Sequence, residues 1–180
     1  MAQAILENQN NNKDLIESLE KFSNFDAEIA VIGCLLWDNR TYEKIADFLI
    51  EDHFTDINNK KIFSVIKRLL DQNILVTPIT LKNYLENDDK DNFDNYKYLS
   101  QIKDSAPSIQ NAYQYAKLLY ELHIKRSLIG IGQGLVQNTI TNEQNLQGNT
   151  LIENAENDLY NLSQTGSADR KHLLFNQALK

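Results

Sequence analysis

The sequence predicts an all-α protein with a compact multi-helix head, followed by a long antiparallel helical hairpin and the start of a linker helix. Three observations lead to this prediction. From residue 24 onward, the apolar residues recur at helical rather than alternating spacing. After Ser108, about 30 residues pass without a helix breaker other than glycine, enough for a rod of about 45 Å. After a polar turn, another apolar pattern begins with helix start signals.

The first two helices are expected at residues 25–37 and 42–50. The first carries apolar or small residues at i, i+3, i+4 and i+7, namely Ile29, Ile32, Gly33 and Leu36. Either Asn39 or Thr41 can cap the second helix. Its expected buried side consists of Ile45, Phe48 and Leu49. The segment from Glu51 to His53 then interrupts the pattern. We interpret it as a solvated turn rather than a catalytic cluster, because no nucleophile or second base stands at a defined spacing.

Three further helices complete the predicted head. The third is expected at residues 58–72, with a basic side formed by Lys60, Lys61, Lys67 and Arg68. Thr77 and Pro78 start a short fourth helix that runs to Glu86, because threonine caps a first turn and proline fits the first position. Residues 87–95 are acidic and predict a loop. The fifth helix is expected at residues 96–103 and ends before Pro107.

The long helix after Ser108 is apolar on two sides, so it needs two neighbours. One stripe consists of Tyr115, Leu118, Leu122, Ile129 and Val136. The other lies roughly opposite and consists of Ile124, Leu128, Ile131 and Leu135. One neighbour is expected after the turn at residues 141–149, where Thr150 and Glu153 match a capping box. That helix presents a line of apolar residues made of Ile152, Ala155, Leu159 and Leu162. The two helices would form an antiparallel hairpin.

Three glycines, Gly130, Gly132 and Gly134, cluster on the long helix. No strand precedes them and no Lys-Ser/Thr follows, so a phosphate-binding loop is not indicated. They predict a place where another backbone approaches closely or where the rod bends. Trp37 and most of the eight tyrosines are interpreted as core residues rather than as platforms for stacked bases, which would need interleaved Arg or Lys.

These elements divide the chain into four parts. Residues 1–22, rich in Asn, Gln and charge, predict a mobile leader. The head covers residues 23–107 and the hairpin residues 108–165, with Gly166 as a helix cap. Residues 166–180 form a polar connector and the start of a linker helix. Because the chain stops inside that apolar segment, we expect it to be part of a longer protein.

Composition and charge exclude several functional classes. The formal net charge is −7 and the pI is about 4.9, which argues against a stand-alone nucleic-acid binder. The longest apolar run, residues 30–37, is far shorter than the roughly 20 residues that cross a bilayer. A single Cys34 and no secretory signal predict a cytoplasmic protein. The sequence contains no G-x-x-x-x-G-K-[ST] and no zinc-binding spacing, so we expect no catalytic residue, cofactor or metal in this chain.

Several short motifs, in order over residues 25–165, resemble those of bacterial replicative DNA helicases of the DnaB family. The similar segments are FDAEIAVIGCLL (25–36), DHF (52–54), KIFSVI (61–66), TPITLKNYL (77–85), YL (98–99), PSIQNAYQYA (107–116) and KRSLI (125–129). The resemblance is to the N-terminal domain of the family, its hairpin and the first turns of the linker helix. The motor domain, with its ATP and Mg²⁺ site, would follow residue 180.

The resemblance implies a non-catalytic collar. In such a collar the hairpin pairs with the hairpin of another subunit, and the dimers assemble as a trimer of dimers in a hexamer. It also implies recruitment of primase, with contact positions that carry over to Tyr98, Ile129 and Leu135, and contacts with a helicase loader. DNA would be held mainly by the absent motor domain. Together with the first stripe, the interface residues are Tyr98, Tyr115, Leu118, Leu122, Ile129 and Leu135.

Two other classes remain open. The first is the helicase-binding domain of a primase, which is built on a similar head and hairpin. Here the domain begins within about 25 residues of Met1 and runs into a further helix, which favours the helicase. The second is a small helical DNA-binding module that uses the basic side of the third helix. The acidic balance of the chain argues against it.

Overall fold

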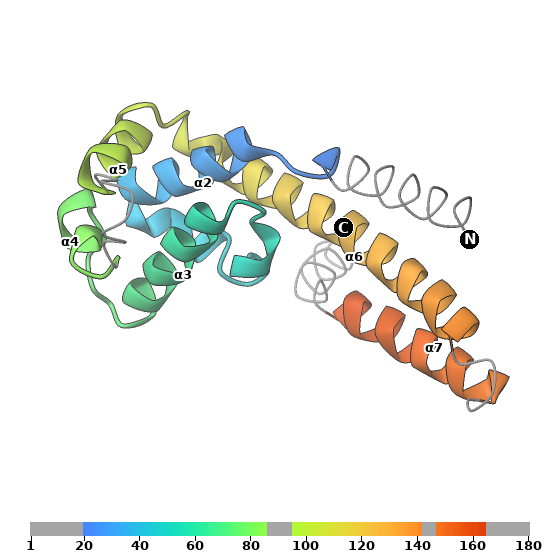
Figure 1. Cartoon of the computed structure of the whole chain (residues 1–180). Helices are drawn as coiled ribbons and strands as arrows, with labels where there is room; N and C mark the ends of the chain where they lie inside the picture. The colour runs from blue at the N-terminus through green and yellow to red at the C-terminus, as the bar shows by residue number, and fades with distance from the viewer. Residues whose placement is uncertain (1–19, 86–94, 142–146, 165–180) are drawn as a thin grey trace, which may run out of the picture.

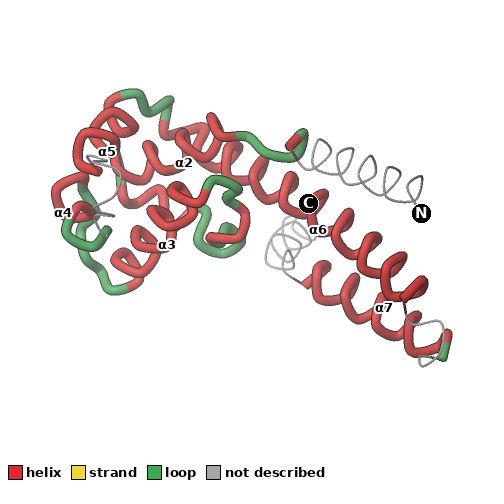
Figure 2. Tube along the Cα trace, in the orientation of Figure 1, coloured by secondary structure: helices red, strands yellow, loops and turns green. Residues whose placement is uncertain are grey.

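The computed structural model describes residues 20–85, 95–141 and 147–164, and in these residues every regular element is a helix (Figures 1 and 2). This confirms the all-α prediction. In chain order the elements are α2 (Phe25–Trp37), η1 (Asn39–Lys44), η2 (Glu51–His53), α3 (Ile57–Asp71), α4 (Pro78–Lys82), α5 (Asn95–Asp104), η3 (Ile109–Asn111), α6 (Ala112–Thr141) and α7 (Gly148–Gln164). The predictions for residues 1–19, most of the acidic loop, the Gly166 cap and the linker helix lie outside the described residues.

Helix α2 lies at the centre of the head and contacts α3, α5 and α6. It begins where the Asn24 side chain accepts a hydrogen bond from the Ala27 amide at 2.9 Å, and it spans the residues that the sequence predicted. Most of its residues are buried, and they are apolar or small on nearly every side of the helix. This is expected for a helix with neighbours on several sides. Close packing against α5 depends on Gly33. A Cβ there would lie 2.8 Å from the Ile102 carbonyl oxygen.

Helices α3 and α4 begin at side-chain caps. The Asp56 carboxylate accepts from the amides of Asn58 and Asn59, and Thr77 accepts from the Thr80 amide. The predicted start of α3 is therefore confirmed to within one residue, and the predicted start of the fourth helix at Thr77 and Pro78 is confirmed. The α4 helix ends at Lys82, four residues before the predicted end. The predicted fifth helix is also present as α5, one residue longer at each end.

The predicted helix at residues 42–50 is wrong. The chain forms the 3-10 helix η1 at Asn39–Lys44 and then a turn. Asn39 does not cap a helix, because its amide donates to the carbonyls of Leu35 and Val76 and its oxygen accepts from the Val76 amide. Asp38 supplies the cap instead. The predicted apolar side is nevertheless buried, since Ile45, Phe48 and Leu49 all belong to the core.

The 30-residue helix α6 joins the head to the hairpin. Its first half packs on the head, and its second half lies beside α7 and projects away from the head (Figure 1). The predicted antiparallel hairpin is therefore present. The prediction of a capping box at Thr150 and Glu153 is wrong, because α7 already begins at Gly148 and Thr150 lies inside its first turn. The Thr150 amide donates to the Gln147 carbonyl instead.

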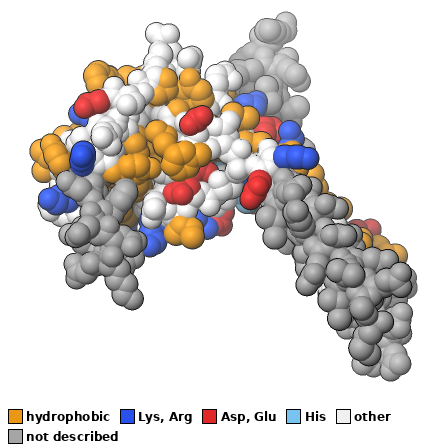
Figure 3. All heavy atoms as spheres, turned by 45° about the horizontal axis from the view of Figure 1, so that its top comes forward, with side chains coloured by type: hydrophobic (Ala, Val, Ile, Leu, Met, Phe, Trp, Pro, Cys, Tyr) orange, Lys and Arg blue, Asp and Glu red, His pale blue; other side chains and the backbone are white. Residues whose placement is uncertain are grey.

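Most of the tyrosines pack against the core, as predicted, but Trp37 and three tyrosines do not; the five that do are Tyr42, Tyr98, Tyr113, Tyr115 and Tyr120. Trp37, the last residue of α2, is 59% exposed, and the ammonium of Lys103 on α5 lies 5.9 Å from the centroid of its ring. Tyr84, Tyr96 and Tyr160 are exposed as well. Figure 3 shows that apolar side chains gather on one face of the head.

Candidate interaction surfaces

A buried carboxylate holds Tyr98 in place. Glu28 of α2 is fully buried, and its oxygens accept hydrogen bonds from the Thr55 amide and hydroxyl, both at 2.6 Å. They also accept from the Asp56 amide at 3.3 Å and from Nδ2 of Asn59 at 3.1 Å. The Tyr98 hydroxyl of α5 donates to Oδ1 of Asn59 at 3.1 Å. This network links α2, α3 and α5, so the half-buried Tyr98 is positioned by the core of the head.

No role was predicted for Glu28 from the sequence. A signal was available, because Glu28, Ile32 and Leu35 stand four and three residues apart and share one face of α2. A carboxylate on that apolar face must be buried and must find donors. The position of Tyr98 also affects the protonation of its hydroxyl. Burial raises the pKa of Tyr98, and the nearby carboxylates of Asp56 and Glu28 add to this effect, so the hydroxyl keeps its proton.

The segment Glu51–His53 is not the solvated turn that the sequence predicted. His53 is 1% exposed and lies against α6, with its ring centroid 4.6 Å from that of His123 and 5.4 Å from that of Tyr120. Arg126 donates to the carbonyls of His53 at 2.9 Å and of Phe22. The imidazole and guanidinium groups thus form the joint between the head and α6.

The basic side of α3 is partly neutralised within the chain. Lys60 pairs with Asp52 at 2.6 Å, and Lys67 pairs with Glu51 at 3.3 Å. Both acidic partners come from η2, directly before the joint with α6. The pairing reduces the positive charge that the predicted DNA-binding face could offer to phosphates, so the structure gives this alternative no support.

The first stripe of α6 divides into two parts. Near the head, Tyr115 packs against the core and Leu122 is only 9% exposed, whereas Leu118 is 40% exposed. Beyond Arg126, the stripe continues with Ile129 and Val136, and Ile140 extends it by one more turn; we call these three residues the distal stripe. Ile129 is half-buried, but Val136 and Ile140 are 60% and 62% exposed. Leu122 therefore belongs to the interior of this chain, and the open part of the stripe is the distal one.

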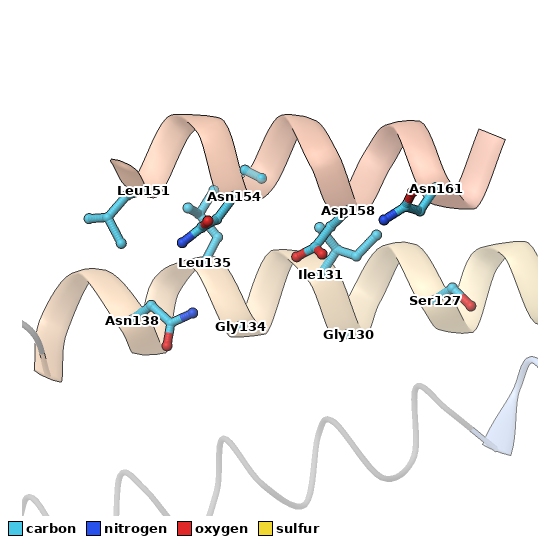
Figure 4. A pocket seen from close by; sticks show the side chains of 11 residues that line it. Ser127, Gly130, Ile131, Gly134, Leu135, Asn138, Leu151, Asn154, Asp158 and Asn161 are labelled. Carbon is cyan, nitrogen blue, oxygen red and sulfur yellow. The ribbon is translucent and has the colours of Figure 1, made fainter. Parts of the chain in front are cut away.

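A cavity of about 410 Å³ lies between the second half of α6 and α7 and is lined by residues of both helices (Figure 4). Its lining from α6 includes Ile131, Leu135 and the backbone of Gly130 and Gly134, and its lining from α7 includes Asp158. A Cβ on Gly130, Gly132 or Gly134 would meet no atom within 4 Å. Among the described residues, no backbone approaches the glycine cluster closely, so the first of the two predicted roles is not seen within this chain, and a bend of the rod stays a prediction.

Helix α7 presents apolar side chains outward. Ile152 and Leu159, which the sequence placed on the face towards the long helix, are 57% and 47% exposed, and Tyr160 is 63% exposed. Ala155 and Leu162 of the same predicted line are half-buried. Leu128 and Leu135 of α6 are also exposed, at 46% and 41%. Both helices of the hairpin thus leave large apolar side chains uncovered in the single chain.

The six predicted interface residues do not form one patch. Tyr98 lies on the head, Tyr115 and Leu122 are covered by the head, and Leu118, Ile129 and Leu135 are on other parts of α6. Ile129 and Leu135 are six residues apart, which places them about 120° apart around the helix. A partner that touches Tyr98 and both of these residues must span the head and the hairpin.

The described residues contain no group of three or more His, Cys, Asp and Glu side chains that could hold a metal ion. None of their helices is both long and apolar enough to cross a membrane. Cys34 is buried in α2, and burial raises the pKa of its thiol, which disfavours the reactive thiolate.

The arrangement of helices defines an all-α domain with a head and a projecting hairpin. The family model of the DnaB-like helicase N-terminal domain matches residues 20–121, and the chain belongs to this family. The chain is 31% identical over 145 residues to the replicative DNA helicase DnaB of Rickettsia conorii, an alignment that covers 80% of this chain and 29% of that relative. The corresponding helicase of Pasteurella multocida is 25% identical over 153 residues.

Solved structures have the same fold. The crystal structure of the N-terminal domain of the DnaB helicase from Mycobacterium tuberculosis matches with a TM-score of 0.67 at 19% identity, over 77% of this chain and 97% of that one. A DnaB-like replicative helicase, whose structure was described together with its interactions with primase, matches with a TM-score of 0.61 at 20% identity. That match covers 77% of this chain and 31% of the helicase. The chain spans less than a third of the length of the whole helicases that it matches.

Proposed function

We propose that this chain is the non-catalytic N-terminal collar of a hexameric replicative DNA helicase and that it mediates subunit pairing and primase recruitment. In the whole protein, a C-terminal motor domain would bind ATP and Mg²⁺ and hold most of the DNA, and the protein would act in the bacterial cytoplasm. A helicase loader is a further expected partner. The family membership of residues 20–121 supports this proposal.

The observation that carries the pairing role is the uncovered apolar surface of the hairpin. Val136 and Ile140 on α6 and Ile152, Leu159 and Tyr160 on α7 are between 47% and 63% exposed. Covering a large apolar side chain stabilises an assembly by about 1.5 to 3 kcal/mol. Several such side chains on one projecting element favour association with another chain.

Light scattering and sedimentation of the purified chain test the pairing role. We expect a dimer or larger species at high micromolar concentration. The variant Leu159→Asp should weaken association at least tenfold, because a carboxylate replaces an exposed apolar group on α7. Asn157→Asp is the matched control, since it adds the same charge to an exposed polar position of the same helix. A wild-type chain that stays monomeric throughout this range would contradict the proposal.

Primase recruitment rests on Tyr98, Ile129 and Leu135, which the family resemblance indicates. The fixed position of Tyr98 supports a role as an anchor, because a side chain that is already ordered loses little entropy on binding. Calorimetric titration with the C-terminal domain of the cognate primase tests each position. Changing any one residue to Ala should reduce the binding free energy by about 1 to 3 kcal/mol, with little change in salt dependence. Arg68→Ala on the basic side of α3 should have little effect.

Two results would count against these positions. If the wild type binds primase and all three variants bind equally well, the contact lies elsewhere, and the basic side of α3 becomes the next surface to test. If Arg68→Ala weakens binding and the salt dependence is steep, the recognition is electrostatic rather than apolar. Circular dichroism of each variant checks that the helices remain folded.

A further inference from the structure

The cavity between α6 and α7 combines an apolar interior with a polar rim. The half-buried part of its lining consists of apolar residues from both helices, Ile131, Leu151 and Ala155. Asn154, Asp158 and Asn161 also line the cavity, and all three are exposed. They stand four and three residues apart, so they share one face of α7. The cavity is therefore open to solvent at this rim, and we call it the hairpin groove.

The hairpin groove offers a negative charge that no cation of the hairpin balances. Residues 127–164 include no Lys, Arg or His. The acidic residues in this range are Glu143, Glu153, Glu156 and Asp158. Figure 4 shows the carboxylate of Asp158 pointing from α7 towards α6. Within the described part of the chain, no ion pair involves Asp158. The groove is thus complementary to a positive charge on an otherwise apolar surface.

We propose that the hairpin groove binds a helix of another protein that carries one arginine among small and apolar residues. The backbone of Gly130 and Gly134 lines the α6 side of the groove, and a Cβ on either would meet no atom within 4 Å. A bound helix can therefore approach α6 closely there. From Ser127 to Asn138, the α6 side of the groove is about 16 Å long, which matches three turns of a helix. An amphipathic helix in an apolar groove is a recurrent mode of recognition.

The rim selects arginine and excludes the hairpin of a second copy. The Asp158 carboxylate can accept two parallel N–H groups from one guanidinium, and the amide oxygens of Asn154 and Asn161 can accept further donors. The hairpin of a second copy supplies no cation, because its residues 127–164 contain none either. The partner is therefore a different protein, and the site does not depend on the pairing role.

Calorimetric titration of the full chain with synthetic peptides tests the charge recognition. The probe is an amidated helical peptide of about 15 residues, with Ala, Leu and one central Arg on one face and Gln on the other. It should bind at least tenfold more tightly than the same peptide with Gln in place of Arg. Asp158→Asn should remove this preference. The matched control Glu156→Gln loses the same charge about 160° away around α7 and should keep the preference. Absence of binding, equal binding of the two peptides, or a preference that survives in Asp158→Asn would overturn the proposal.

A second pair of variants tests the place of binding. Gly134→Leu puts a large side chain into the groove and should weaken binding of the Arg peptide at least tenfold. Gly132→Leu makes the same change on the side of the distal stripe, outside the groove lining, and should leave binding unchanged. Circular dichroism checks that both variants keep their helices. Equal affinities of the two variants would overturn the assignment to the groove.

Sedimentation of the chain with the Arg peptide separates this site from the pairing role. If self-association displaces the peptide, a second copy occupies the groove and the proposal is overturned. A dimer that still binds the peptide supports it. A chain that stays monomeric and binds the Arg peptide with the stated preference also supports the groove, while the proposed pairing role fails.

Discussion

His53 and His123 lie against one another at the joint between the head and α6, with their ring centroids 4.6 Å apart. Burial, the neighbouring His123 and Arg126 lower the pKa of His53 to about 3. Burial and Arg126 lower the pKa of His123 as well. Asp52 opposes these effects, and its carbonyl oxygen lies 3.1 Å from Nδ1 of His123. Both imidazoles are therefore held in the neutral form.

This joint predicts a pH-dependent stability. An unfolded chain protonates histidine near pH 6.5, whereas folded His53 does so only near pH 3. The unfolded state binds more protons between these values, so stability is complete above about pH 6.5 and decreases as the pH falls. At pH 5, His53 alone should cost about 2 kcal/mol. Urea unfolding at pH 7 and pH 5 measures the loss. His53→Gln should reduce the difference in the free energy of unfolding between pH 7 and pH 5 by half or more. An unchanged difference would contradict the assignment of this effect to His53.

The Glu28 network predicts a large loss of stability in Glu28→Gln. The glutamine amide group would direct N–H donors towards the donors of Thr55, Asp56 and Asn59, leaving buried groups unpaired. We expect a loss of about 3 kcal/mol in the free energy of unfolding, measured by urea titration. Asp26→Asn is the matched control, because Asp26 is exposed in the same first turn. A loss as small as that of the control would show that the network contributes little.

Two glycines should respond in opposite ways to alanine. Gly33→Ala places a methyl group 2.8 Å from the Ile102 carbonyl and 3.1 Å from Cβ of Ala106, so α2 and α5 must separate. A loss of about 1 to 3 kcal/mol is expected from overpacking. Gly132→Ala meets no atom within 4 Å and should stabilise α6 by about 0.5 to 1 kcal/mol. Thermal unfolding of both variants gives the comparison, and the same sign for both would refute it.

The isolated chain should hydrolyse no ATP above background. Its sequence lacks the glycine-rich motif that holds nucleotide phosphates and the lysine and hydroxyl that accompany it. A longer protein that also carries the proposed C-terminal motor domain should hydrolyse ATP with Mg²⁺. A phosphate-release assay on both proteins checks this prediction. Turnover that persists in a contaminant-free sample of the short chain would contradict the non-catalytic role.

Helix periodicity predicted α2 and α3 well, because both bury regularly spaced apolar residues. Helix α2 has the expected bounds, and α3 differs by one residue at each end. The segment at residues 42–50 was predicted incorrectly, although its apolar residues are buried. There the amide of Asn39 bonds to Val76, which is 37 residues away, and no local pattern contains that contact.

The interaction surfaces were less predictable than the helices. Two apolar stripes were visible on the long helix, but which parts are covered depends on where the head ends along α6. Leu122 is buried, whereas Val136, nearly three turns beyond the joint at Arg126, is exposed. The ring contact between His53 and His123 also joins residues 70 positions apart, and a single histidine in a polar turn gives no sign of it.

The fluorescence of Trp37 can report on the contact between α2 and α5. It is the single tryptophan of the chain, it stands at the end of α2, and Lys103 of α5 lies above its ring. A cation close to an indole changes the emission, so separation of α2 from α5 would alter the signal. The hairpin carries no tryptophan. Emission therefore reports on opening of the head, whereas pairing of hairpins leaves it unchanged, and the two events can be followed separately in the same unlabelled sample.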